Sequence, residues 1–108
     1  MPTHPGQFIR RHVLQRLDVS GAELARSLRF NRVALHYVLS GRNGITPALA
    51  VRLEAFSGVP AKDWLSLQQR YDIVLAQMKA KDELAQITAY NGALLMLAEA
   101  MADEMETP

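Results

Sequence analysis

The sequence of 108 residues contains no cysteine, no long apolar run and no secretory signal. The lack of cysteine excludes disulfide bonds, thiolate metal sites and a cysteine nucleophile. No apolar segment approaches the roughly 20 residues that a membrane-spanning helix needs, so no membrane partner is expected. The first residues lack the basic patch and apolar segment of a secretory signal. We therefore expect a cytoplasmic protein with one modest hydrophobic core.

The sequence also lacks the motifs that common catalytic sites require. Its histidines, His4, His12 and His36, show no metal-ligand spacing. There is no glycine-rich phosphate loop and no Gly-x-Ser-x-Gly turn. A domain of this size also leaves little room for a deep apolar pocket. We therefore expect neither an enzyme nor a bound metal or cofactor.

Charge is nearly balanced over the whole chain, with a net of +1, but it is unevenly distributed. Residues 1–45 contain seven arginines and only Asp18 and Glu23 as acids, a net charge of +5. Residues 46–78 are neutral, and residues 79–108 carry a net charge of −4. Arginine suits phosphate and guanine better than lysine does. The basic front, which is residues 1–45, is compatible both with a polyanion partner and with an ordinary solvated surface.

Apolar spacing and capping residues predict helices throughout, and no segment alternates as a strand would. Five helices are expected in residues 1–78. They begin at Pro5, after Ser20, after Asn31, after Thr46 and at Pro60, and they end, in the same order, near Leu17, Leu28, Ser40, Ser57 and Met78. A short polar helix at 82–88 and a last helix at 93–105 follow. The fold class is therefore all-α, with five helices in a compact bundle and an acidic helical extension over residues 79–108.

Spacings of three and four residues indicate which side chains enter the core. The first helix is expected to bury Ile9, Val13 and Leu17. The fourth helix is expected to bury Leu49, Leu53 and Phe56. The fifth helix carries an apolar stripe formed by Trp64, Leu67, Tyr71, Leu75 and Met78.

The second and third helices are short and are joined by a very short link, which is the helix-turn-helix pattern. The second helix of such a pair, which is the third helix of this chain, enters the major groove of DNA. In this helix Leu35, Val38 and Leu39 are expected to face inward. The predicted DNA-binding residues are those on the opposite side, at the helix cap and in the following turn: Asn31, Arg32, Val33, His36, Tyr37, Arg42 and Asn43. The last two lie where the chain would pass the sugar-phosphate backbone.

Each side chain of the outward strip suits a particular contact. Arg32 can bond bidentately to guanine O6 and N7, and Val33 can press on a thymine methyl group. His36 and Tyr37 can donate to base acceptors or phosphates. Other roles stay open at this point, because Asn31 can serve as a cap alone, Tyr37 can lean on the bundle edge and His36 can be merely solvated.

Several short motifs within residues 4–78 occur together in one known family. They are His4-Pro5-Gly6, Ala22-Glu23-Leu24-Ala25, Ser40-Gly41-Arg42, Gly44-Ile45-Thr46-Pro47 with Ala50-Val51-Arg52-Leu53, Gly58-Val59-Pro60-Ala61, Trp64-Leu65-Ser66-Leu67-Gln68 and Tyr71-Asp72. With these residues the chain resembles the XRE-type (lambda-repressor-like) helix-turn-helix family and, within it, the HigA/VapI antitoxin branch. Three residues depart from the family pattern. Arg29 stands where the family often has glycine, and Phe30 stands where a smaller aliphatic residue is usual. Asp63 precedes Trp64 where the branch often has an aromatic residue.

The resemblance implies a lambda-repressor-like DNA-binding domain in residues 1–78, with residues 79–108 as a helical extension. It further implies the antitoxin of a type II toxin–antitoxin (HigBA-like) module. Such a protein is a homodimer that binds double-stranded operator DNA, represses its own promoter and neutralises a HigB-like, RelE-type ribonuclease toxin. The alternative is an orphan XRE-family repressor without a toxin partner.

The fifth helix and the last helix are the candidates for dimer formation. Trp64, Leu67 and Tyr71 can equally close the core of one chain. The candidate dimer residues are those beyond the compact bundle: Leu75, Met78, Leu94, Leu97 and Met101. The acidic extension can lie against a basic toxin, or it can simply keep an exposed helix in solution.

Overall fold

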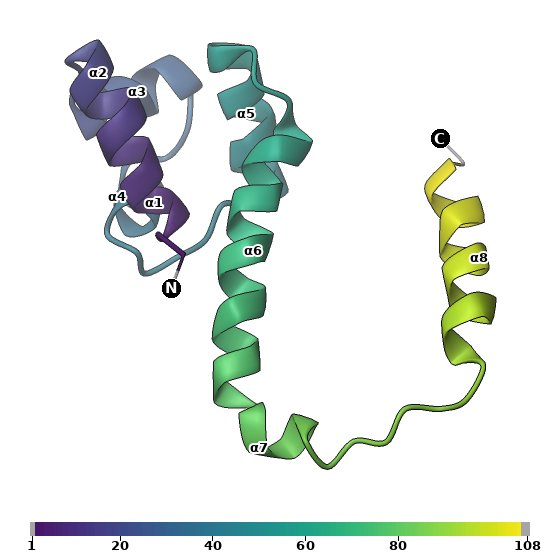
Figure 1. Ribbon diagram of the computed structural model, residues 1–108. Coiled ribbons are helices and arrows are strands. Elements are labelled where there is room, and N and C mark those ends of the chain that lie inside the picture. The colour runs from purple at the N-terminus through teal and green to yellow at the C-terminus, as the bar shows by residue number, and fades with distance from the viewer. Residues whose placement is uncertain (1, 107–108) are drawn as a thin grey trace. The chain divides into compact units, whose positions relative to one another are not determined.

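The computed structural model describes residues 2–106, which are largely helical (Figure 1). Within these residues there is no strand, so the all-α prediction is confirmed. The packing divides the chain into two units, one ending at Met78 and the other beginning at Lys79. In the part of the chain that the structure describes, no helix combines the length and the apolar character needed to cross a bilayer.

The five expected helices of the first unit are present. This unit contains α1 (Pro5–Ile9), the π-helical turn η1 (Arg10–Leu14), α2 (Gln15–Leu17), α3 (Gly21–Leu28), α4 (Arg32–Leu39), α5 (Pro47–Ser57) and all but the last residue of α6 (Ala61–Lys79). Because α1, η1 and α2 follow one another without a break, they form a single helix. The second unit contains α7 (Lys81–Leu84), which is shorter than the predicted helix at 82–88, and α8 (Ala93–Glu106).

The first helix is fixed at its start by three consecutive residues. His4 has an extended backbone, and its Nδ1 accepts a hydrogen bond from Gly6 N at 2.9 Å. Pro5 occupies the first helical turn, where its missing N–H costs little. A Cβ atom on Gly6 would overlap the carbonyl oxygen of Val38. Glycine at this position therefore allows α1 to pack directly against the backbone of α4.

The π-helical turn changes which face of the first helix is buried. Ile9 and Val13 are buried as expected, but Leu17 is 54% exposed, so its predicted burial was wrong. A π-helical turn bonds residue i to i+5, so the spacing of four that relates Ile9 to Val13 does not continue through it. Leu14 packs against the core instead.

The core lies among α1, η1, α3, α4, α5 and the first part of α6. Its buried members are Ile9, Val13, Leu24, Ala25, Leu28, Leu35, Val38, Leu39, Ile45, Leu49, Ala50, Leu53 and Trp64. Phe56 is not among them, since it lies in the last turn of α5, past Leu53, and is 39% exposed. Its predicted burial was therefore wrong. No residue of α6 after Gln68 is buried, so this helix continues beyond the core (Figure 1).

Candidate nucleic-acid interface

The two short helices α3 and α4 pack against each other and are connected by residues 29–31. Each begins at a polar cap. Ser20 Oγ accepts a hydrogen bond from Glu23 N at 3.1 Å, and Asn31 Oδ1 accepts one from Ala34 N at 2.9 Å. These bonds satisfy backbone donors that an α-helix leaves free at its start. Asn31 is thus a cap, and its exposed amide group remains available for a further contact.

The link between these helices reverses direction at Arg29, whose backbone lies in the left-handed region with φ 51° and ψ 44°. Arg29 N donates to Arg26 O at 3.1 Å, and Phe30 N donates to Ala25 O at 2.9 Å. This pair of bonds is a Schellman motif, which normally has glycine at the left-handed position. Arginine there costs about 1–2 kcal/mol. The carbonyl of Arg29 accepts a bond from Arg52 Nε of α5 at 3.4 Å, which ties the link to the bundle.

The orientation of α4 follows its apolar spacing. Leu35, Val38 and Leu39 are buried at 1, 3 and 7% exposure. The opposite side presents an exposed strip, which consists of Arg32, Val33, His36 and Tyr37. Val33 is 59% exposed although it is aliphatic, so it is available to a partner rather than to the core. The strip has the expected orientation, and its contact with DNA stays a prediction.

The turn after α4 is closely tied to the end of that helix. Gly41 has φ 84°, and its N–H donates to Val38 O at 3.1 Å. The carbonyl of Tyr37 accepts bonds from Arg42 N at 2.9 Å and from Asn43 N at 3.1 Å. The Arg42 guanidinium carbon lies 5.6 Å from the centre of the Tyr37 ring, within the range of a cation–π contact. The exposed strip and the predicted phosphate-binding turn therefore meet at Tyr37.

The π-helical turn η1, which continues α1, supports the end of α4. Arg10 Nε donates to Leu39 O at 2.7 Å. A cation at this position satisfies a carbonyl at the C-terminal end of α4. Its positive charge also interacts favourably with the negative end of the dipole of that helix. Sequence reasoning counted Arg10 only as part of the basic front, because the two residues are 29 positions apart.

The charge of this region is of one sign. No aspartate or glutamate occurs between Glu23 and Glu54, a segment that contains the end of α3, all of α4 and most of α5. The arginines within it are Arg26, Arg29, Arg32, Arg42 and Arg52. Because no acid within this segment offsets these charges, their field favours an anionic partner such as phosphate. Among residues 2–106 there is no group of three or more histidine and acidic side chains that could hold a metal.

The chain is similar to known proteins in both sequence and structure. Virulence-associated protein I of Dichelobacter nodosus is 31% identical over 74 residues, which is 68% of each chain. An addiction module antidote protein of the HigA family from Coxiella burnetii has a TM-score of 0.78 at 31% identity, covering 82% of this chain and 98% of the other. The Pseudomonas aeruginosa antitoxin HigA, solved with the higBA promoter, has a TM-score of 0.79 at 26% identity, covering 84% and 99%.

No protein-family model matches the chain. The three similar proteins are named for virulence, as an antidote and as an antitoxin, and not as enzymes. This agrees with the expectation from the sequence that the chain is not an enzyme.

Proposed function

The chain belongs to the HigA/VapI branch of the XRE-type helix-turn-helix DNA-binding proteins, and from this we propose that it is an operator-binding repressor and the antitoxin of a type II toxin–antitoxin module. The observation that supports DNA binding most directly is the exposed strip of α4. It is held in place by a buried opposite face and lies in a segment with arginines and no acids.

The proposed DNA contacts follow from the position of each side chain. Helix α4 enters the major groove, where Arg32 bonds to guanine and Val33 contacts a thymine methyl group. His36 and Tyr37 donate to base acceptors or phosphates. The proposed backbone contacts come from the cap and the turn that flank α4: Asn31, Arg42 and Asn43. Base contacts specify the sequence, whereas phosphate contacts fix the register.

A homodimer is proposed because one module of this kind buries only about 600–1,000 Å² of protein surface on DNA. A two-fold dimer that reads half-sites about 34 Å apart, or a multiple of that spacing, adds the specificity that one module lacks. Leu75 is half-buried and Met78 is 62% exposed in the single chain, so both can contact a second copy. In α8, Leu94, Leu97 and Met101 are 80, 49 and 64% exposed.

The proposed toxin partner is a HigB-like ribonuclease acting in the cytoplasm. An RNA-cleaving enzyme needs a basic surface, and the net charge of −4 in residues 79–108 complements such a surface. The test is co-expression with the product of a short basic reading frame just upstream, using the full chain and a chain that lacks residues 93–108. Rescue of growth by the full chain supports the antitoxin role, and failure to rescue leaves the orphan repressor.

The test of DNA binding is a titration of a duplex from the chain's own promoter between 50 and 200 mM salt. Arginine contacts to phosphate release counterions, so affinity falls steeply as salt rises. A scrambled duplex of the same length is the control, and its binding is expected to be much weaker at each salt concentration. Affinity that stays flat over this range contradicts the proposal.

A further inference from the structure

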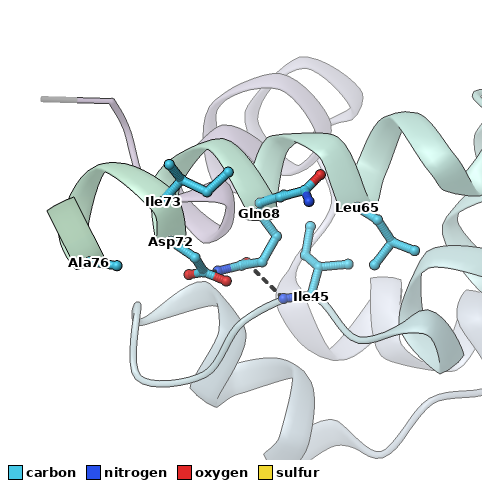
Figure 2. A pocket seen from close by; sticks show the side chains of 7 residues that line it. Ile45, Leu65, Gln68, Asp72, Ile73 and Ala76 are labelled. Atoms are coloured by element: carbon cyan, nitrogen blue, oxygen red, sulfur yellow. Dashed lines mark hydrogen bonds between the residues drawn. The ribbon is translucent and has the colours of Figure 1, made fainter. Parts of the chain in front are cut away.

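Gln68 is the one polar side chain among the buried residues of the described chain, with 8% exposure. It lies on α6, and its two amide atoms have different partners, of which Ile45 is marked by the dashed line in Figure 2. Gln68 Oε1 accepts a hydrogen bond from Ile45 N at 2.8 Å, and Gln68 Nε2 donates to Asp72 Oδ1 at 3.0 Å. A buried amide is tolerated when it is hydrogen-bonded in this way. Asp72 thereby fixes which end of the Gln68 amide faces the turn.

The side chain of Gln68 also leaves no room for a side chain at position 44, which is occupied by Gly44. A Cβ atom at this position would lie 2.7 Å from both Cδ and Nε2 of Gln68. The backbone of Gly44 is not in the left-handed region, so glycine is needed here for space and not for conformation. The turn therefore packs its backbone directly on the Gln68 amide.

The turn between α4 and α5 is thus held at both ends. Tyr37 O accepts the N–H groups of Arg42 and Asn43 at one end, and Gln68 accepts that of Ile45 at the other. Arg42 and Asn43 are themselves bonded at the first end, Asn43 is separated from the second end by Gly44 alone, and the side chains of both are exposed. A turn that is fixed before binding loses less conformational freedom when it contacts a partner.

We propose that Gln68, oriented by Asp72, is a positioning residue for DNA: it holds the turn that presents Arg42 and Asn43 to phosphate without touching DNA itself. The inference rests on the proposed function, because it needs those two residues to contact a DNA backbone. It assigns to α6 a contribution to DNA affinity that is separate from any contribution to dimer formation.

The first test compares Gln68→Met with Gln69→Met in the full chain. Methionine at 68 is similar in size but leaves Ile45 N without its acceptor. Gln69 is the neighbouring residue on α6, is exposed, and its side chain makes no hydrogen bond among the described residues, so its variant is the matched control. Binding of the promoter duplex is measured over a range of salt concentrations, at a temperature where circular dichroism shows each variant to be folded.

We expect Gln68→Met to bind the duplex about tenfold more weakly. This is the effect of losing one charge-assisted hydrogen bond between the turn and a phosphate. The slope of log affinity against log salt concentration should become shallower by about 0.9 for each phosphate that the variant no longer neutralises. Gln69→Met should match the wild type in both respects. A lower melting temperature with unchanged affinity and slope would show that Gln68 only stabilises the fold, and would overturn the inference.

A rescue variant separates the hydrogen bonds from the packing. Gln68→Glu retains an oxygen for Ile45 N but places a carboxylate against that of Asp72. The double variant Gln68→Glu with Asp72→Asn restores the bond between the two side chains with donor and acceptor exchanged. We expect the single variant to bind weakly and the double variant to recover most of the affinity and the salt slope. Failure of the double variant to exceed the single one contradicts the inference.

Amide hydrogen exchange of the free protein gives a readout that needs no DNA. Gln68→Met should speed exchange at Ile45 and at Arg42 and Asn43, whereas Gln69→Met should not. Unchanged exchange at these amides overturns the inference. If the wild type binds the promoter duplex and Gln68→Met binds it with the same affinity, the inference alone is overturned. A wild type that does not distinguish the promoter duplex from a scrambled one overturns the proposed function and the inference together.

Discussion

Gly6 lies against the backbone of Val38 so closely that one methyl group on Gly6 would overlap the Val38 carbonyl oxygen. The contact joins the first turn of α1 to the last turn of α4. Together with the bond from Arg10 Nε to Leu39 O, it determines where the exposed strip of α4 stands relative to the rest of the bundle. Residues outside the exposed strip thus set the position of the residues that are proposed to contact DNA.

Gly6→Ala is expected to destabilise the protein by about 1–3 kcal/mol, because the added methyl forces α1 and α4 apart. The destabilisation is measured as a fall in the free energy of unfolding in urea. Gly21→Ala is the control, since its Cβ atom would meet only the end of the Leu39 side chain at 3.2 Å, and that side chain can move. Equal destabilisation of the two variants would show that the approach to Val38 has no special cost.

Arg29→Gly is expected to be more stable than Arg29→Ala by about 1 kcal/mol, because only glycine enters the left-handed region without strain. Both variants remove the same charge and the same long side chain, so the comparison isolates the backbone. The free energy of unfolding is measured by chemical denaturation. If the alanine variant is as stable as the glycine variant, the turn between α3 and α4 is relaxed in solution and the strain assigned to Arg29 is absent.

Arg32→Ala and Arg42→Ala are expected to weaken DNA binding in different ways. Removal of the Arg32 side chain should cost about 1–3 kcal/mol at one base position and relax specificity there. Removal of the Arg42 side chain should weaken binding to all duplexes alike and reduce the salt slope by about 1. The measurement is a set of titrations against single-base variants of the promoter duplex. An equal fall in affinity on every duplex for Arg32→Ala would assign this residue to phosphate.

His4 is expected to make the stability depend on pH. Burial of its ring lowers the pKa below the ordinary value of 6.5, and the Asp72 carboxylate opposes this only in part. The ring also stacks edge-on with Tyr71, and its Nδ1 must be unprotonated to accept the bond from Gly6 N. The folded state therefore binds a proton more weakly than the unfolded state does. Its contribution is complete above pH 6.5 and is lost as the pH falls through 6.5 towards the lower pKa of the folded state.

The pH effect is measured by urea unfolding at several values from about pH 8 down to about pH 5, a range that begins above 6.5 and extends below it. His4→Asn is the control, because asparagine is also a good N-cap but does not titrate. His12 and His36 are common to both proteins, so the difference between their pH profiles isolates His4. Parallel profiles would show that protonation of His4 is not linked to folding.

The sequence by itself determined what depends on neighbouring residues. The helix starts at Ser20, Asn31 and Thr46 follow from side chains that bond to backbone three positions away. The inward and outward faces of α4 follow from apolar spacing, because eight consecutive helical residues leave only one way to bury Leu35, Val38 and Leu39 together. Apolar spacing and capping residues also indicated the all-α class, and the family motifs added the lambda-repressor-like fold within it.

The tertiary structure decided the rest. The π-helical turn that exposes Leu17 and the end of the core before Phe56 depend on how the elements pack, which a helical period does not contain. The contacts of Gly6 with Val38 and of Gln68 with Ile45 join residues more than twenty positions apart, and the sequence has no local signal for such pairs. Glycine at 6 and 44 is explained only by the atom that occupies the space beside it, and that atom is known only once the chain is folded.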